Sequence, residues 1–285
     1  MEYNYGKIWV VGASGRIGSM IHNMLDIRHS ELFETDSEEL DITDAKAVNL
    51  FGSRNRPNTI INCAGIADSQ FCEEHMEEAY KVNALGVRNL SAIARKIDAR
   101  IIQISTDDIF CDVTETAHHE FDAPNPTNVY GKSKLAGENF VKELAPKHLI
   151  LRSSWVYAKD GKNFVNYILR CAEEGKTVEA PIDDFACPTS AKELTRVLLR
   201  LIEAEQEGIY HAVCRGYCSR YELAQEIFRL LGKDESLVIP VKLYGEAGPR
   251  YTILDDMMLR MCEMERPVTW KEALAEYIED YKKTI

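Results

Sequence analysis

Short apolar runs alternate with longer amphipathic stretches through the first half of the chain. The runs have the length of strands and are rich in β-branched residues, whereas apolar side chains recur near every 3.6 residues in the stretches between them. Strands that alternate with helices in this way predict an α/β fold, with a parallel sheet and helices on both of its faces. The predicted strands are Lys7–Val11, Leu32–Thr35, Thr59–Asn62, Arg100–Ile104 and His148–Arg152.

Three helices are predicted between these strands. The first begins in a glycine-rich turn and ends near Leu25, the second covers about Glu73–Lys96, and the third covers about Lys132–Glu143. A long loop, about Phe110–Asn128, precedes the third helix and contains Pro124 and Pro126.

Helices dominate after the fifth predicted strand. Two of them start at a serine, Ser190 or Ser219, that is followed three residues later by a glutamate, which is the capping-box pattern. One further strand is predicted at Gly208–Val213. The predicted helices are Gly161–Glu174, Ser190–Glu205, Ser219–Leu231, Leu254–Met264 and Thr269–Lys283.

These patterns predict two parts without a flexible linker between them. We expect a Rossmann-type, doubly wound parallel sheet that binds a dinucleotide, formed by residues 1–155 and about 188–214. We expect a smaller, mostly helical C-terminal substrate lobe, formed by residues of about 156–187 and 215–285.

The composition of the chain disfavours some classes of binding partner. The chain has 34 Lys and Arg against 46 Asp and Glu, and the resulting net charge of −12 opposes binding to nucleic acid or to an anionic membrane surface. No apolar run approaches the roughly 20 residues that cross a bilayer. The eight cysteines form no C-x-x-C pair, and we expect them to be thiols in a reducing cytoplasm.

A glycine-rich loop follows the first predicted strand and opens the first predicted helix. Gly12 permits the turn, Gly15 lets a pyrophosphate approach the backbone, and Gly18 lets helix and strand pack closely. The helix then offers N–H groups to the phosphates. A flexible turn is the alternative interpretation, but the position between strand and helix favours a dinucleotide.

The choice between NADH and NADPH stays open at this level. Acids at the end of the second strand, Glu34 and Asp36, accept hydrogen bonds from a ribose and repel a 2′-phosphate, whereas Arg16 attracts one. Asp41 is a candidate for the adenine edge, although helix capping by Thr43 or Asp44 accounts equally well for that stretch. We therefore expect use of both cofactors.

Tyr130 and Lys134 form the candidate catalytic pair. Residues four apart share one face of a helix, and an ammonium beside a phenol is expected to lower the pKa of Tyr130 from about 10 toward neutrality. Thr106 closes the fourth strand, at the sheet edge where α/β proteins bind ligands, and its hydroxyl is placed to hold a carbonyl oxygen beside Tyr130.

The motifs resemble those of the extended short-chain dehydrogenase/reductase family and, within it, the dTDP-4-dehydrorhamnose reductases. The resemblance extends over nearly the whole chain. Its motifs are Gly12–Gly18, Asn62–Gly65, Ile104–Phe110, Asn125–Glu138, Arg152–Tyr157, Gly161–Val165, Asp183–Thr189 and Arg250–Asp255.

The resemblance implies an NADPH- or NADH-dependent reduction of the C4 ketone of a nucleotide-diphosphate sugar, dTDP-4-dehydro-L-rhamnose to dTDP-L-rhamnose. It further implies that Tyr130 would protonate the C4 oxygen, that Lys134 would hold the nicotinamide ribose, and that Thr106 would polarise the ketone. The implied cofactor residues are Gly12, Ser14, Gly15, Arg16, Ile17, Gly18, Asp36, Asp41, Ala64, Gly65, Tyr130 and Lys134. The implied substrate residues are Asp107, Trp155, Asn163, Pro188, Thr189 and Arg250.

Several positions depart from the family pattern. Asp108 replaces a tyrosine, and we expect its carboxylate to be solvated and turned from the C4 oxygen. His118 and His119 lie in a loop of unusual spacing, and we expect both to be exposed. Some relatives bind Mg²⁺ through acids at a dimer contact, but Ile17 and Lys192 stand at matching positions here, so no metal site is predicted.

Two other functions are compatible with these patterns, as is a homodimer. An epimerase or dehydratase of the same superfamily retains its cofactor through turnover. A non-catalytic binding or regulatory subunit with a reductase-like fold has no turnover at all. The presence of Tyr130, Lys134 and Thr106 argues against the non-catalytic subunit, although the substitution at Asp108 and the altered loop keep that alternative open.

Overall fold

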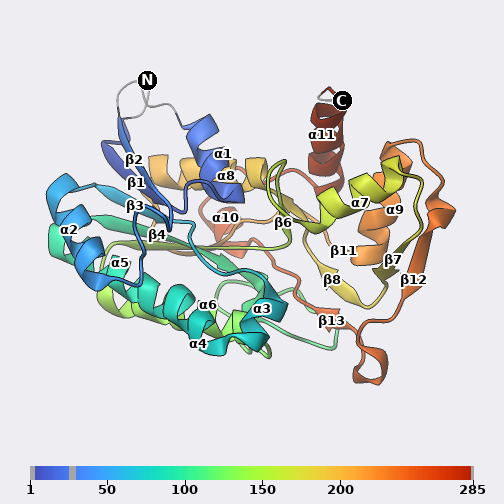
Figure 1. The fold of residues 1–285 in the computed structure, drawn as a ribbon, viewed down its shortest axis with the longest axis horizontal. Coiled ribbons are helices and arrows are strands. Elements are labelled where there is room, and N and C mark those ends of the chain that lie inside the picture. Colours follow the sequence, from blue (N-terminus) through green and yellow to red (C-terminus); the bar gives the residue numbers. More distant parts are fainter. Residues whose placement is uncertain (1–3, 26–29, 284–285) are drawn as a thin grey trace. The chain divides into compact units, whose positions relative to one another are not determined.

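The computed structural model describes residues 4–25 and 30–283 (Figure 1). The chain forms two compact units, each built from three segments. The first unit comprises Met1–Ile109, Ala123–Arg152 and Leu198–Tyr210, and the second comprises Phe110–Asp122, Ser153–Val197 and His211–Ile285. It stays a prediction that one part binds a dinucleotide and the other a substrate, with the boundaries expected above.

A six-stranded sheet organises the first unit and confirms the predicted fold class. Its order is β10-β5-β4-β3-β1-β2, and β1 pairs in parallel with both β2 and β3, as β3 does with β4. Every strand predicted for this sheet is present. The strands are β1 (Lys7–Val11), β2 (Glu31–Thr35), β3 (Thr59–Asn62), β4 (Arg100–Thr106), β5 (His148–Ser153) and β10 (Gly208–His211).

Helices cover both faces of this sheet. Helices α5 (Val87–Ile97) and α6 (Val129–Leu144) run along one face, and α1 (Arg16–Met24) lies on the other (Figure 1). The buried apolar positions of the strands pack against α5 and α6, with Trp9 and Ile101 among the core residues. The alternating pattern of the sequence therefore translates directly into layers.

The prediction of a single helix over residues 73–96 is wrong. The chain forms α3 (Ser69–Glu74), α4 (Met76–Tyr80) and a π-helical turn, η1 (Lys81–Gly86), before α5. His75 separates α3 from α4, because its φ of −129° and ψ of 56° are not helical. Apolar periodicity is kept across these breaks, which is why the pattern reads as one helix.

Helix α2 (Ala45–Asn55) was not predicted, although its cap was considered. The Asp44 side chain accepts hydrogen bonds from the backbone N–H groups of Lys46 and Ala47, so the capping alternative for Asp44 is confirmed. Helix α2 packs beside α5.

The second unit combines the predicted helices with short strands that the sequence did not reveal. Capping boxes begin α9 at Ser219 and α11 at Thr269. The helices are α7 (Phe164–Glu173), α9 (Arg220–Leu230), α10 (Met257–Met261) and α11 (Trp270–Lys282), while α8 (Ala191–Glu203) continues into the first unit. Short 3₁₀ turns are η2 (Asp107–Ile109), in the first unit, and η3 (Glu235–Leu237) and η4 (Gly245–Ala247), in the second.

Three small sheets hold the second unit together around an apolar core that includes Leu223, Phe228 and Leu274. Strand β8 lies between β11 and β13, β6 pairs with β9, and β7 pairs with β12. The strands are β6 (Val156–Tyr157), β7 (Val178–Pro181), β8 (Asp184–Ala186), β9 (Thr189–Ser190), β11 (Cys218–Ser219), β12 (Val238–Val241) and β13 (Arg250–Tyr251).

The loop at 110–122 belongs to the second unit and is anchored there. Asp112 bridges to Tyr251 and His118 to Leu254. The His118 ring stacks on Phe110 at a centroid distance of 4.3 Å, and its Nε2 lies 3.0 Å from a carboxylate oxygen of Asp112. The expectation that His118 is exposed is therefore wrong, because the side chain is buried in this stack. His119 is half-buried.

All eight cysteines are free thiols. Across the part of the chain that the structure describes, no helix is both long enough and apolar enough to cross a membrane.

Candidate active site

The order in which the chain adds strands to the sheet changes sides between β1 and β3. From β1 the chain passes to β2 on one side, whereas β3 lies on the other side, and open α/β sheets bind ligands outside the carboxyl ends of strands at such a point. The loops that follow β1 and β3 approach closely there. A Cβ on Gly12, whose φ is +76°, would lie 2.7 Å from the backbone nitrogen of Ala64. Only glycine allows this approach.

The loop after β1 is held by backbone contacts. Gly12 N donates to the Thr35 carbonyl oxygen at 2.8 Å, and Ser14 N donates to both carboxylate oxygens of Asp36 at 3.2 and 3.0 Å. Gly15 is the N-cap of α1, which has no side-chain cap among the described residues. A Cβ on Gly15 would meet only the Gly12 carbonyl oxygen, at 3.2 Å. A helix N-terminus with this much room fits the pyrophosphate of a dinucleotide.

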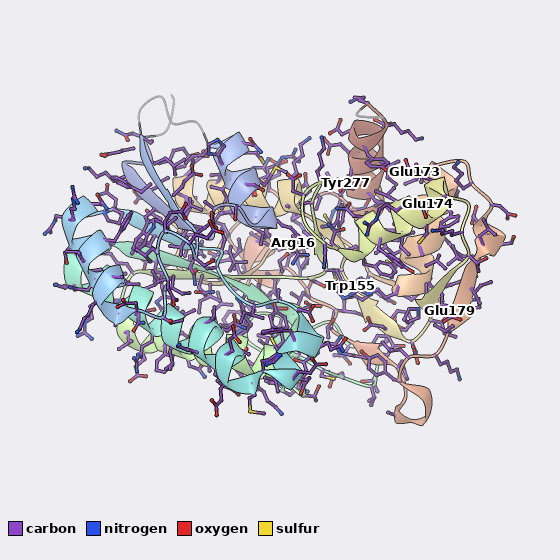
Figure 2. All side chains as sticks on the ribbon, in the orientation of Figure 1. Arg16, Trp155, Glu173, Glu174, Glu179 and Tyr277 are labelled. Carbon is purple, nitrogen blue, oxygen red and sulfur yellow. The ribbon has the colours of Figure 1, made fainter. Side chains whose placement is uncertain are left out.

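The acids expected to read the adenosine end have partners within the fold. Besides the loop contact of Asp36, Asp41 accepts from the backbone N–H and the hydroxyl of Thr43, both at 2.8 Å, and a carboxylate oxygen of Glu34 lies 3.0 Å from His22 Nδ1. Their predicted contacts with the cofactor stay predictions. Arg16 starts α1 (Figure 2), and its positive charge acts on Tyr130 by lowering the pKa of that phenol.

Tyr130 lies in the first turn of α6, close to Thr106 at the end of β4, whose hydroxyl acts to lower the pKa of the phenol. Thr106 and Tyr130, which the sequence predicted to lie side by side, are neighbours in the structure. The direction of the predicted pKa shift is wrong, however. Burial, with the nearby Asp108 and Asp107 carboxylates, raises the pKa of Tyr130 above its ordinary value, and Lys134 is not among the groups that shift it. Tyr130 thus keeps its proton at neutral pH.

Lys134 lies one helical turn further along α6 and is buried. Its Nζ donates to the carbonyl oxygen of Ile104 at 2.7 Å. Burial lowers the pKa of Lys134 to about 8, against the opposing effect of Glu138. Glu138 is itself fixed by a buried pairing with Arg152, whose Nε and terminal nitrogen donate to it at 3.0 and 2.8 Å. The Lys134 amine is therefore held beside the ends of β3 and β4, and about half of these groups carry a proton at pH 8.

Asn83 was missed by sequence reasoning and fixes the geometry of this corner. Its Oδ1 accepts from Ile66 N at 2.8 Å, and its Nδ2 donates to the Ile66 carbonyl oxygen at 2.9 Å and to Ser133 Oγ at 3.0 Å. It thus links the segment after β3 to α6. Asn83 lies in the π-helical turn, a type of local irregularity that is common at functional sites, but no feature of the sequence indicated it.

Asp108 is half-buried and engaged, so the expectation of a solvated carboxylate is wrong. Its Oδ1 accepts from Asn128 Nδ2 at 2.8 Å, and Asn128 in turn caps α6 through a 2.7 Å contact with Gly131 N. The backbone N–H of Asp108 donates to Thr106 Oγ1 at 3.2 Å. The neighbouring Asp107 is buried and accepts from the same hydroxyl, also at 3.2 Å. Asp108 thereby braces both Thr106 and the start of α6.

The predicted substrate residues, apart from Asp107, lie in the second unit. Trp155 directly precedes β6 (Figure 2), and its φ of 40° is left-handed, which is unusual for a bulky residue. Thr189 is fully buried; its hydroxyl donates to the Cys187 carbonyl oxygen and accepts from the backbone N–H of Cys214. Pro188 is also buried. Asn163 caps α7. Contacts of all the predicted substrate residues with a substrate stay predictions.

Two residues around Trp155 were not predicted. The Arg220 guanidinium carbon lies 3.4 Å from the centroid of the Trp155 ring. Asp184, which is buried, accepts from Arg220 Nε at 3.3 Å and from a terminal nitrogen of Arg250 at 3.4 Å. The capping box at Ser219 correctly predicted the start of α9, but nothing in the sequence indicated that Arg220 reaches Trp155.

Within residues 4–25 and 30–283, no group of three or more His, Cys, Asp or Glu side chains is placed to hold a metal ion.

Known proteins resemble this chain along almost its full length. It matches the family described as RmlD substrate binding domain over residues 6–283. A dTDP-4-keto-6-deoxy-D-glucose reductase of Streptomyces niveus is 32% identical over 274 residues, which cover 94% of this chain and 95% of the relative.

Two solved structures share both fold and sequence with it. A dTDP-4-dehydrorhamnose reductase of Clostridium acetobutylicum is 40% identical, with a TM-score of 0.91 over 97% of this chain and 99% of that chain. A dTDP-4-dehydrorhamnose reductase of Bacillus anthracis, solved in complex with NADP, is 32% identical, with a TM-score of 0.91 over 96% of this chain and 99% of that chain.

Proposed function

The chain belongs to the RmlD substrate binding domain family, and we infer from this membership and from its site that it is an NAD(P)H-dependent reductase of a dTDP-linked 4-keto-6-deoxy sugar. The substrate that we propose is dTDP-4-dehydro-L-rhamnose, with dTDP-L-rhamnose as the product. The observation that carries the proposal is that the partly buried Tyr130, in the first turn of α6, lies beside the buried Thr106 at the end of β4, next to the loop that fits a dinucleotide. A ketone reduction needs both a proton donor and a place for the cofactor at that edge.

The chemistry of the chain's own residues follows from this geometry. A nicotinamide dinucleotide bound at the Gly12–Gly18 loop supplies the hydride that reduces C4. Thr106 Oγ1 donates a hydrogen bond to the ketone oxygen and fixes its position. Tyr130 donates its proton to that oxygen as negative charge develops on it, which completes the alcohol. The raised pKa of Tyr130 suits this direction, because the phenol starts each cycle protonated.

Lys134 supports the cofactor in this proposal. Its Nζ is held by the Ile104 carbonyl oxygen, and a Cβ on Gly65 would lie 3.7 Å from it. This position, between the carboxyl ends of β3 and β4, is compatible with the ribose contact that the family resemblance implies. Asn83 and Asp108 act as braces for α6, and they do not need to touch the reacting atoms.

The identity of the sugar rests on the relatives. The names of the Streptomyces and Clostridium proteins both describe reductases of dTDP-linked 4-keto sugars, which differ in the sugar. Trp155 and Arg250 are the residues of the second unit that we propose for contact with this substrate. The expected cytoplasmic location and the homodimer remain predictions.

The test is a turnover assay on the full chain. Purified protein is mixed with dTDP-4-dehydro-L-rhamnose and either NADPH or NADH, and the reduced nicotinamide absorbance is followed while dTDP-L-rhamnose is quantified by chromatography. We expect one product molecule for each cofactor molecule oxidised, with both cofactors accepted. A changed sugar without net oxidation of the cofactor would identify an epimerase or dehydratase. Binding of both ligands without any product would identify a non-catalytic subunit.

A further inference from the structure

We propose that Arg220 is a positioning residue that holds the Trp155 indole in the orientation that receives the sugar, and that Asp184 holds Arg220 in place. The role of the indole toward the sugar rests on the proposed function. The contact between Arg220 and Trp155 does not, and it can be tested separately.

The Arg220 guanidinium lies against aromatic rings of the second unit. Its central carbon is 3.4 Å from the centroid of Trp155 and 4.9 Å from that of Phe164. Tryptophan is the aromatic partner that binds a cation most strongly, and a planar guanidinium can also stack on the ring. Arg220 is therefore the charged group that packs on the Trp155 ring.

The small sheet of the second unit explains why Arg220 reaches this position. Strand β11 pairs with β8 so that Ser219 lies opposite Phe185, and Ser219 caps α9. Arg220 is thus the first residue of α9 and emerges beside the start of β8, where Asp184 lies. The Asp184 side chain, 7% exposed, accepts from Arg220 Nε at 3.3 Å. A buried carboxylate at this point fixes the direction of the guanidinium plane.

The backbone at Trp155 makes its ring dependent on such a contact. Pairing of β6 with β9 begins at the next residue, Val156, which lies opposite Thr189. The left-handed φ of 40° at Trp155 is disfavoured for a large side chain and persists where the surroundings hold it. Trp155 is only partly buried and packs on one side against the apolar core of the second unit, so the guanidinium of Arg220 over its ring supplies much of what restrains the indole.

This arrangement predicts a specific kinetic effect. If the sugar binds only to protein with the indole in place, the apparent affinity falls in proportion to the population of that state, while the bound complex still reacts normally. We therefore expect Arg220→Gln to raise the KM for the sugar nucleotide by about 5- to 30-fold, the range that a partly desolvated cation–π contact represents, with kcat changed by less than about 3-fold.

The experiment compares three variants of the full chain. Arg220→Gln removes the cation, and Arg220→Lys keeps the charge without the planar group. Arg229→Gln is the matched control because Arg229 lies on the same helix with an exposed side chain that pairs with Glu226, not with an aromatic ring. Near-ultraviolet circular dichroism and fluorescence report the indole, with Trp155→Phe defining the signal of Trp155 against those of Trp9 and Trp270. KM, kcat and thermal unfolding are measured in parallel.

We expect Arg220→Gln to change the Trp155 signal and raise KM, Arg220→Lys to restore part of both, and Arg229→Gln to match the wild type. An unchanged Trp155 signal in folded Arg220→Gln would overturn the proposal that Arg220 holds the Trp155 indole. A changed signal with an unchanged KM, or a loss of kcat alone, would overturn the positioning role. If the wild type does not reduce the sugar, the proposed function fails. The spectra and the titration of the Trp155 signal with dTDP still decide whether Arg220 holds the Trp155 indole.

Discussion

The side chains around Tyr130 and those around Trp155 are held in opposite ways. In the first unit, Lys134 donates to the Ile104 carbonyl oxygen and Asn83 bonds both backbone groups of Ile66. In the second unit, charged side chains hold one another: Asp184 accepts from Arg220, which lies over Trp155, and from Arg250, and elsewhere in that unit Asp256 accepts from two arginines. The buried Glu138–Arg152 pair is an exception within the first unit.

This difference has a physical consequence for substitution. A side chain whose partner is the backbone, such as Lys134, can be removed without leaving another charged side chain unpaired. A carboxylate that holds two cations cannot be removed without releasing both of them. The chemical step should therefore be sensitive to single atoms in the first unit, whereas geometry and stability should be sensitive to charge in the second.

The largest effect is expected from Tyr130→Phe. The substitution removes the proton donor and leaves the ring, so turnover should fall by at least about 10²-fold, the lower end of general acid contributions. Unfolding should change little, because the phenol hydroxyl is not a backbone brace. Tyr157→Phe is the control, since the buried Tyr157 hydroxyl has no hydrogen-bond partner among the described residues. Steady-state kinetics decide, and near-normal turnover of Tyr130→Phe would assign the acid elsewhere.

Gly15→Val tests the dinucleotide loop. The backbone at Gly15 has a φ of −68° and a Cβ there meets only one carbonyl oxygen, so the folded state should tolerate the change. A branched side chain in the path of the pyrophosphate should weaken NADPH and NADH binding by about 30-fold, corresponding to an overpacking cost of about 2 kcal/mol. Calorimetry measures both affinities, with Gly15→Ala as the smaller control. Unchanged binding in a folded Gly15→Val protein would rule out this loop as the phosphate site.

Asp256→Asn tests, through the free energy of unfolding, whether paired charges stabilise the second unit. Asp256 is buried and accepts from Arg260 at 2.7 Å and from Arg266 at 2.7 and 2.8 Å, although both arginines are partly exposed. Allowing for this exposure, we expect the free energy of unfolding to fall by about 1 kcal/mol. The exposed Asp280, paired with Lys283, provides the control in Asp280→Asn, which should leave denaturant unfolding unchanged. Equal effects of the two substitutions would show that the charge of the buried Asp256 does not stabilise the second unit.

The smallest effect is a pH dependence at Lys134. Its pKa is lowered to about 8, so the ammonium is present below that pH and is lost as pH rises through it. The kcat/KM for the cofactor should therefore decline above about pH 8, and Lys134→Met should lack this inflection while Lys132→Met, altered at an exposed site on the same helix, keeps it. Stability should move in the opposite direction. Because the fold favours the neutral amine, unfolding free energy rises between pH 8 and the model-compound value of 10.5.

Sequence reasoning succeeded where one periodicity or one spacing carried the signal. The apolar run at Lys7–Val11 became β1 with the same bounds, and the four-residue spacing of Tyr130 and Lys134 placed both on α6. It failed for α2, where Val48 and Gly52 are the only buried residues and the apolar face is weak. Two-residue strands such as β6 and β11 have no periodicity to detect.

The errors within the site arose from contacts between distant segments. The pKa of Tyr130 depends on burial and on the charge of Asp108, which the spacing of Tyr130 and Lys134 does not reveal. The burial of His118 depends on the pairing of its loop with the segment after β13. Likewise, Arg220 meets Trp155 because β11 and β8 pair, and pairing of such short strands cannot be inferred from local pattern.

The path of the chain between the two units constrains how this protein is made and how it can be recombined. Because each unit is assembled from three alternating segments, neither can be excised as a continuous piece of the gene. During synthesis, the first sheet also stays incomplete until Gly208–His211 emerges to cover the edge of β5. At about 5–20 residues per second, that open edge is exposed for several seconds after β5 has been made. A nascent chain stalled within this interval carries an unpaired strand, so slow codons between β5 and β10 should increase its dependence on chaperones.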